Sequence, residues 1–116
     1  MSDFIIYHNP RCSKSRQTLQ ILTEKDASVK IVLYLENPPS AEEIKSILDK
    51  LELNSRDIIR KGEEEYKRFN LKEKNFTETD LIDFMVKNPK LLERPIVVKG
   101  DKAVIGRPPE NVLSLF

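Results

Sequence analysis

The stretch RPIVVKGDKAVIGRPP, residues 94–109, carries the clearest β pattern in this chain. Two apolar, β-branched runs, Ile96–Lys99 and Lys102–Ile105, flank the pair Gly100-Asp101. Glycine in the first central position of a two-residue loop favours a type II′ turn, whose twist matches that of a hairpin. The stretch therefore predicts an antiparallel pair of strands, and Pro108-Pro109 directly after it is able to open a last helix.

A parallel pair of strands is predicted at the other end of the chain. Residues 4–7, FIIY, form a short apolar run that the segment HNP at residues 8–10 interrupts. Helical character begins at about Ser13, and the β-branched run KIVLYL at residues 30–35 predicts a second strand. The helical crossover between the two strands is long enough for a right-handed βαβ unit.

Helical signals fill the middle of the chain. Ser40 and Glu43 form a capping box ahead of apolar residues that share one helix face. The other segments that we expect to be helical are residues 55–61, residues 63–69 and a helix opened by Thr77–Asp80 and closed by Asn88-Pro89.

The order of elements is β-α-β, a helical middle, then β-β-α. A parallel pair joined to a hairpin gives an α/β fold, with a thioredoxin-like four-stranded mixed sheet flanked by helices. We expect one domain over residues 1–116, with an all-helical insert at about residues 36–92.

Composition excludes several classes of function. Twenty basic and 19 acidic side chains give a net charge of +1, so neither a nucleic-acid-binding nor a membrane-binding surface is expected. The amino terminus lacks the basic start and apolar run of a signal peptide, which favours the cytoplasm, where thiols stay reduced. One cysteine and one histidine are too few for a structural metal site. No apolar seam indicates an oligomer, so we expect a monomer.

The single cysteine, Cys12, follows a proline turn at the start of the first predicted helix. Unpaired N–H groups and the helix dipole favour a thiolate there, and Arg11, Lys14 and Arg16 add positive charge. Ser15 lies one helical turn away, within reach of the sulfur. The alternative is a buried apolar cysteine, but a strand–turn–helix junction flanked by cations is a poor core position.

The spacing around Cys12 excludes two familiar sites. A dithiol redox motif would have cysteine where Ser15 stands, and a Cys-x5-Arg phosphate loop would have arginine where Thr18 stands. A lone nucleophilic thiol must therefore be regenerated by an external thiol.

Other candidate site residues lie at the boundaries of predicted elements. His8 either tunes the thiolate or merely ends the first strand. Arg60, Arg94 and Arg107 each sit at an element boundary, where a guanidinium group is able to bind an oxyanion, although a solvated or helix-capping role is the alternative for each. The Arg94-Pro95 bond is a candidate cis bond.

Four segments together resemble the glutaredoxin-coupled arsenate reductases: IYHNPRCSKSRQTL, VLYLENPPS, RPIVV and IGRPPE. The resemblance implies that Cys12 attacks arsenate, or a similar small oxyanion, and that Arg60, Arg94 and Arg107 clamp it. It also implies that His8 and Ser15 stabilise the thiolate and that Pro95 is the cis-proline facing the cysteine. No bound cofactor is implied; glutathione would be the co-substrate and glutaredoxin the protein partner.

Two other functions fit the same residues. One is a monothiol oxidoreductase that acts on glutathione mixed disulfides. The other is a non-enzymatic, protein-binding regulator of the same fold. A related branch that binds RNA polymerase typically carries Cys-x-x-Cys in this loop, and Ser15 argues against that sensor here.

Overall fold

The computed structural model describes residues 3–116; Met1 and Ser2, which the signal-peptide argument and the expected 1–116 domain include, lie outside the described residues. The chain divides into two compact units. The first runs to Asn37 and resumes over Arg94–Phe116, and the second spans Pro38–Glu93. The second unit corresponds to the predicted helical insert, while the expectation that the whole chain is one domain stays a prediction.

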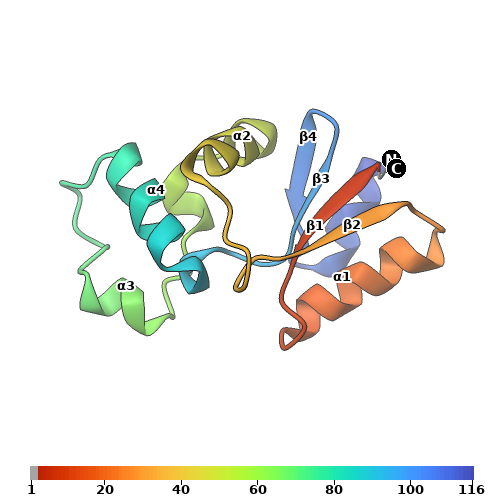
Figure 1. Ribbon diagram of the computed structural model, residues 1–116, viewed down its shortest axis with the longest axis horizontal. Helices are drawn as coiled ribbons and strands as arrows, with labels where there is room; N and C mark the ends of the chain where they lie inside the picture. The colour runs from red at the N-terminus through yellow and green to blue at the C-terminus, as the bar shows by residue number, and fades with distance from the viewer. Residues whose placement is uncertain (1–2) are drawn as a thin grey trace. The chain divides into compact units, whose positions relative to one another are not determined.

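The first unit is built on a four-stranded sheet in the order β2-β1-β3-β4 (Figure 1). The strands are β1 (Phe4–His8), β2 (Val29–Leu33), β3 (Ile96–Lys99) and β4 (Lys102–Ile105). β1 pairs in parallel with β2 and antiparallel with β3, and β3 pairs antiparallel with β4. The predicted mixed sheet is therefore confirmed.

The turn between β3 and β4 is of the type that the glycine in its sequence predicts. Lys99 pairs with Lys102, so only Gly100 and Asp101 form the loop. Gly100 has a φ of 61°, whereas Asp101 is not among the residues with positive φ. A positive φ at the first central position alone is the type II′ pattern that the sequence predicts.

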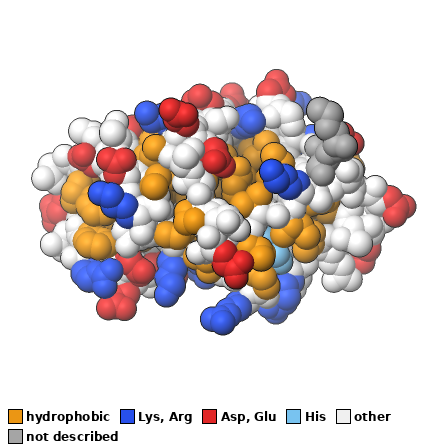
Figure 2. All heavy atoms as spheres, in the orientation of Figure 1, with side chains coloured by type: hydrophobic (Ala, Val, Ile, Leu, Met, Phe, Trp, Pro, Cys, Tyr) orange, Lys and Arg blue, Asp and Glu red, His pale blue; other side chains and the backbone are white. Residues whose placement is uncertain are grey.

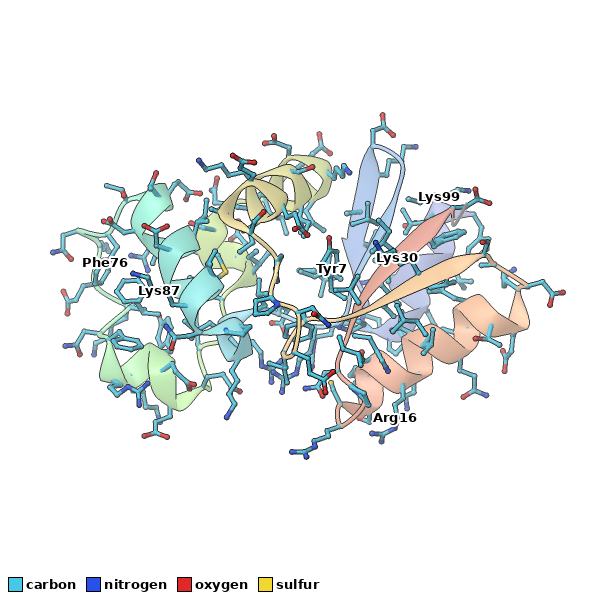
Figure 3. All side chains as sticks on the ribbon, in the orientation of Figure 1. Tyr7, Arg16, Lys30, Phe76, Lys87 and Lys99 are labelled. Atoms are coloured by element: carbon cyan, nitrogen blue, oxygen red, sulfur yellow. The ribbon has the colours of Figure 1, made fainter. Side chains whose placement is uncertain are left out.

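One face of this sheet is covered by α1 (Ser13–Glu24) and the 3₁₀ helix η3 (Pro109–Leu115) (Figure 1). Leu22 of α1 packs with the sheet residues Phe4, Ile6 and Val97 and with Val112 of η3 in one buried cluster. Side chains alternate along a strand, so residue 7 points to the other face, as Figure 3 shows for the labelled tyrosine. The cluster anchors α1 against β1, and this holds the loop that joins them.

The second unit is helical. Its elements are α2 (Ala41–Leu51), η1 (Ser55–Ile58), α3 (Glu64–Arg68), α4 (Glu78–Lys87) and η2 (Pro89–Leu91). Both predicted helix starts are confirmed, because capping boxes form at Ser40 with Glu43 and at Thr77 with Asp80. Figure 3 labels Phe76, which precedes α4 in the sequence, and Lys87, its last residue. Over the face in view, Figure 2 shows acidic and basic side chains interspersed, as the near-neutral charge leads one to expect.

The structure corrects two predicted boundaries. The second strand ends at Leu33 instead of residue 35, because the carbonyl of Leu33 accepts the N–H groups of Glu36 and Asn37 and the chain turns. The helix predicted over residues 55–61 is a single 3₁₀ turn that stops at Ile58.

The shortened helix changes the setting of Arg60. Ile59 forms an isolated antiparallel bridge with Leu92, and the backbone N–H of Arg60 donates to Leu91 O at 2.7 Å. Arg60 therefore directly follows a residue in extended, bridged backbone and is not the last residue of a helix. Pairing with a segment more than 30 residues away in sequence overrides the local helical preference here.

Candidate functional site

The loop that carries the cysteine is fastened by short-range hydrogen bonds. Asn9, which is buried, accepts the N–H of Cys12 with its carbonyl at 3.0 Å and the N–H of Arg11 with Oδ1 at 3.0 Å. Arg16, labelled in Figure 3 near the start of α1, donates from Nη1 to Pro10 O at 2.9 Å. The loop therefore presents Cys12 in a defined position at the first turn of α1.

Cys12 occupies the N-cap position of α1, with extended backbone angles, and is partly buried. Burial raises the pKa of its thiol and is the largest single influence. The backbone N–H of Ser15 lowers that pKa, as do the side chain of Arg94, the N–H of Lys14 and the charge of Arg107. Their combined effect outweighs burial and places the pKa of Cys12 below that of an ordinary thiol.

Two of the three predicted arginines lie beside the sulfur. Nη2 of Arg107 is 3.6 Å from Sγ of Cys12, and Nε of Arg107 donates to Arg94 O at 2.8 Å. Arg94 acts on the sulfur through its own side chain. Both arginines precede cis peptide bonds, Arg94-Pro95 and Arg107-Pro108; the first is the expected candidate and the second was not anticipated.

Gly106 allows the segments that carry Pro95 and Arg107 to lie close to α1. A Cβ at this position would lie 2.5 Å from Thr18 Oγ1 and 2.8 Å from Pro95 Cγ. The N–H of Gly106 also donates to Pro95 O at 2.9 Å. Only glycine allows the strand preceding Arg107 to pack this closely against both α1 and the proline.

His8 and Ser15 form a buried pair under the loop. The Nδ1 of His8 and the hydroxyl of Ser15 are 2.6 Å apart, and that hydroxyl also accepts the N–H of Asn9 at 3.0 Å. Burial lowers the pKa of His8, and the positive charge of Arg16 lowers it further, so the imidazole is neutral near pH 7.

This pair corrects one detail of the sequence interpretation. The hydroxyl of Ser15 was expected to reach the sulfur, but among the described residues its hydrogen bonds are made with His8 and Asn9. It is the backbone N–H of Ser15 that acts on Cys12. A residue at the third helical position offers its N–H toward the cap, and this leaves its side chain available for the neighbouring strand.

Arg60 belongs to the second unit, where two carboxylates hold it. Its Nη1 lies 2.7 Å from Oε1 of Glu93, and its Nε lies 3.5 Å from Oε2 of Glu63. Of the seven predicted site residues, six therefore lie in the first unit, where Arg94, Arg107 and Ser15 act on Cys12. Arg60 has its own ion pairs in the second unit.

Sequence reasoning missed Asn9 and Tyr34. Asn9 was assigned only as part of a strand break, although it accepts two of the hydrogen bonds that fasten the loop. Tyr34 was placed inside a strand, although it is the first residue of the turn after β2 and is 1% exposed. The signal available for both was their position, since each directly follows one strand of the parallel pair.

The part of the chain that the structure describes contains neither a metal-binding cluster nor a membrane-spanning helix. Within residues 3–116, no group of three or more His, Cys, Asp or Glu side chains is arranged to hold a metal ion. Over the same residues, no helix combines the length and apolar character needed to span a bilayer.

The family model described as the ArsC family matches residues 7–115. This chain belongs to the ArsC family. The match includes the cysteine loop, the insert and the cis-proline strand, so the ArsC assignment covers every predicted site residue.

Individual relatives agree with that assignment. The chain is 52% identical to the protein YfgD of Escherichia coli K12, over 95% of this chain and 93% of that protein. It is 46% identical to an arsenate reductase of Haemophilus influenzae, over 97% of each chain. An arsenate reductase of Vibrio cholerae has a solved structure that superposes with a TM-score of 0.96, at 44% identity, over 99% of this chain and 98% of that one. The ArsC fold is therefore confirmed.

Proposed function

We propose that this chain reduces arsenate to arsenite through the thiolate of Cys12, with glutathione and glutaredoxin as the external reductants. One observation carries the proposal: Cys12 has a lowered thiol pKa and lies 3.6 Å from the guanidinium of Arg107. The thiolate is the nucleophilic form of cysteine, and the neighbouring cation attracts an anionic substrate to it. Membership of the ArsC family and the similarity to named arsenate reductases support arsenate as that anion.

The first step is attack of the Cys12 thiolate on arsenic(V). An As–S bond forms, and one arsenate oxygen takes up protons and leaves as water. Arg94 and Arg107 neutralise the anion as it approaches a negatively charged sulfur, which would otherwise repel it. Both arginines act on that sulfur in the resting protein, so the positive charge is in place before the anion arrives.

The second step consumes glutathione. Its sulfur replaces a further arsenic-bound oxygen, which leaves as water. A sulfur–sulfur bond then forms between Cys12 and glutathione, both As–S bonds break, and two electrons pass to arsenic. Hydration completes the released arsenite. A pocket of about 330 Å³ lined by the His8–Arg11 loop and by Leu33, Leu35 and Glu36 offers space beside the cysteine for a small peptide thiol.

The third step regenerates the enzyme. Because Cys12 is the only cysteine in the chain, no internal thiol is available to attack the mixed disulfide. A thiolate of glutaredoxin attacks it, takes the glutathionyl sulfur and releases the Cys12 thiolate. The proposed partners are thus a small oxyanion, glutathione and glutaredoxin, acting on a monomeric chain without a bound cofactor.

Arg60 would be the third clamp. Its guanidinium is already paired with Glu93 and Glu63, so binding an oxyanion requires that it share or release these carboxylates. We expect Arg60→Gln to lower kcat/KM for arsenate at least tenfold, since a charge-assisted hydrogen bond is worth about 1.5–3 kcal/mol. An unchanged kcat/KM would limit the clamp to Arg94 and Arg107.

The experiment that tests the proposal measures arsenite formed from arsenate in the presence of glutathione and glutaredoxin. Turnover should require all three reagents and should be lost in Cys12→Ser. Without glutaredoxin, reaction should stop after one turnover with one glutathionyl group on Cys12, which mass spectrometry detects. Full turnover by Cys12→Ser would remove the proposed nucleophile.

A second function, reduction of glutathione mixed disulfides by a monothiol mechanism, is favoured by the single cysteine. That reaction has no oxyanion to clamp. Activity on a glutathione mixed disulfide that is insensitive to changing Arg60 or Arg107, with no arsenite formed from arsenate, would select it.

A further inference from the structure

Tyr34 lies at the edge of the sheet from which the cysteine loop departs. In the parallel pair, His8 of β1 is in register with Leu33 of β2. Asn9 and Tyr34 are the next residue of each segment, so they leave neighbouring strands at the same edge. The carboxyl ends of parallel strands are where α/β folds place their ligands.

Arg94 reaches the same edge from the other side of β1. Tyr7 pairs with Ile96 in the antiparallel register of β1 and β3, and Arg94 precedes that pair by two residues. Continued past the strand ends, the two registers place Tyr34, Asn9 and Arg94 side by side across the sheet. The register therefore supplies a geometric reason, independent of charge, for these three residues to meet beside Cys12.

The hydroxyl of Tyr34 is buried without a hydrogen-bond partner among residues 3–116. The residue is 1% exposed, so bulk solvent does not reach the group. Buried polar groups without a partner are rare in native proteins and destabilise them, and each instance needs an explanation. A phenol that only fills the core could be replaced by phenylalanine without loss.

The groups around this hydroxyl are those of the proposed anion site. Burial raises the pKa of Tyr34, and the thiolate of Cys12 raises it as well, so the phenol stays protonated near pH 7. The charge of Arg94 and hydrogen bonding from the side chains of Arg94 and Asn9 lower this pKa in turn, so both side chains lie close to the phenol oxygen, although neither makes a hydrogen bond of normal geometry with it. Groups that lower the pKa of a phenol act as donors to its oxygen, so neither accepts the hydrogen of the hydroxyl. The phenol O–H is thus a donor without an acceptor in the described part of the chain. It lies beside Arg94, which acts on Cys12, and beside Asn9, which holds the cysteine loop.

We propose that the Tyr34 hydroxyl donates a hydrogen bond to an oxygen of the oxyanion bound at Cys12, which makes Tyr34 a substrate-binding residue of the site. The inference rests on the proposed function, because the hydroxyl's missing partner is an oxygen of the anion. Arg94 supplies positive charge to that anion, and Tyr34 supplies a neutral donor of fixed direction. A directional donor distinguishes a tetrahedral oxyanion from a monovalent halide, which charge alone attracts equally well.

The test compares wild type with Tyr34→Phe, which removes only the oxygen, and uses Tyr66→Phe in the second unit as the matched control. Alkylation of Cys12 by iodoacetamide is followed at increasing arsenate, phosphate or chloride. Arsenate and phosphate should protect wild type and Tyr66→Phe at equal concentrations. Tyr34→Phe should need about ten times more of either oxyanion, and the weak effect of chloride should be the same in all three proteins.

A second measurement separates binding from a structural role. Thermal unfolding of the anion-free proteins should give Tyr34→Phe a melting temperature equal to or above that of wild type, because no hydrogen bond is lost. The midpoint of the pH dependence of alkylation without anion should move little. A lowered melting temperature together with a shifted alkylation midpoint would overturn the inference and make Tyr34 a structural residue.

The outcomes also separate this inference from the proposed function. Equal protection of wild type and Tyr34→Phe by arsenate overturns the role of Tyr34 and leaves the arsenate reaction standing. Wild type that neither oxyanion protects, and that forms no arsenite, contradicts the oxyanion site itself and with it both proposals.

Discussion

Nη2 of Arg107 lies 3.6 Å from Sγ of Cys12, although 95 positions separate the two residues along the chain. The contact exists because β3 pairs with β1, and β4 then returns beside β3 to the edge where the cysteine loop begins. The β3–β4 hairpin thus brings Arg107 to the start of α1. Its charge and the backbone N–H groups of α1 both lower the pKa of Cys12.

The first prediction concerns the acidity of Cys12. The rate of alkylation by iodoacetamide should rise with pH around a midpoint below the ordinary thiol pKa of about 8.5, because only the thiolate reacts. Cys12 is the only cysteine, so the label reports a single site. A midpoint at or above that of a free thiol would contradict the electrostatic description of the site.

The same lowered pKa makes stability depend on pH. A group whose pKa falls on folding stabilises the folded state fully above its unfolded pKa, and that contribution is lost as pH falls through the folded pKa. The free energy of unfolding of wild type relative to Cys12→Ser should therefore increase as pH rises toward the unfolded thiol pKa and then level off. Urea unfolding of both proteins across this range measures it, and a difference that decreases with pH would show the sign to be wrong.

The second prediction separates the two contributions of Arg107. Arg107→Gln should raise the pKa of Cys12, because the positive charge beside the sulfur is lost. Arg107→Lys keeps a charge but loses the Nε–H that donates to Arg94 O at 2.8 Å. We expect Arg107→Lys to retain most of the lowered pKa while its kcat/KM for arsenate falls at least tenfold, because lysine lacks the planar, two-pronged donor. Equal alkylation midpoints in wild type and Arg107→Gln would exclude the charge effect.

The third prediction concerns His8, the only histidine, whose ring protons can be assigned in an NMR titration without ambiguity. Its pKa should lie below about 6.5, first because the ring is buried and second because Arg16 is nearby. Arg16→Gln should raise this pKa but leave it below the ordinary value, since burial is unchanged. A titration midpoint that does not respond to Arg16→Gln would assign the whole shift to burial.

Stability should again follow the titration of His8. A histidine with a lowered folded pKa binds more protons when unfolded, so its contribution is present above the unfolded pKa and is lost as pH falls from about 6.5 through the folded pKa. Wild type should therefore lose stability in this window more steeply than His8→Gln, which has no titrating group there.

The fourth prediction concerns Gly106. Gly106→Ala places a methyl group 2.5 Å from Thr18 Oγ1 and 2.8 Å from Pro95 Cγ, so one of these neighbours must move. Overpacking of this kind typically costs about 1–3 kcal/mol. Because Pro95 and Arg107 flank the contact, the variant should also show slower alkylation of Cys12. Gly62→Ala is the matched control, since nothing lies within 4 Å of a Cβ there.

A companion variant locates the strain. Thr18→Ala removes both of the threonine atoms that a Cβ at position 106 would meet, Oγ1 and Cγ2. In the double variant, part of the lost stability should return, and the remainder measures the contact with Pro95. Strictly additive losses in a double-mutant cycle would show that the two positions do not clash.

Much of the fold follows from local patterns. The turn at Gly100, the capping boxes at Ser40 and Thr77, and the apolar strand runs were all predicted, and the structure has them. Each depends on residues within a few positions of one another, so periodicity and turn chemistry suffice. The two boundary errors, at Leu33 and Ile58, arise where a turn or a remote bridge takes the backbone groups that a longer element would use.

The sequence alone determined that a lone cysteine stands at a helix start after a proline turn, and therefore that its thiol has no internal partner and needs an external one. Only the tertiary structure decided which groups act on that sulfur. Sheet pairing brings Arg94 and Arg107 to it, packing turns the Ser15 hydroxyl toward His8, and the parallel register sets Tyr34 beside Asn9. Contacts across many tens of residues depend on strand order and register, and no local pattern in the chain specifies these.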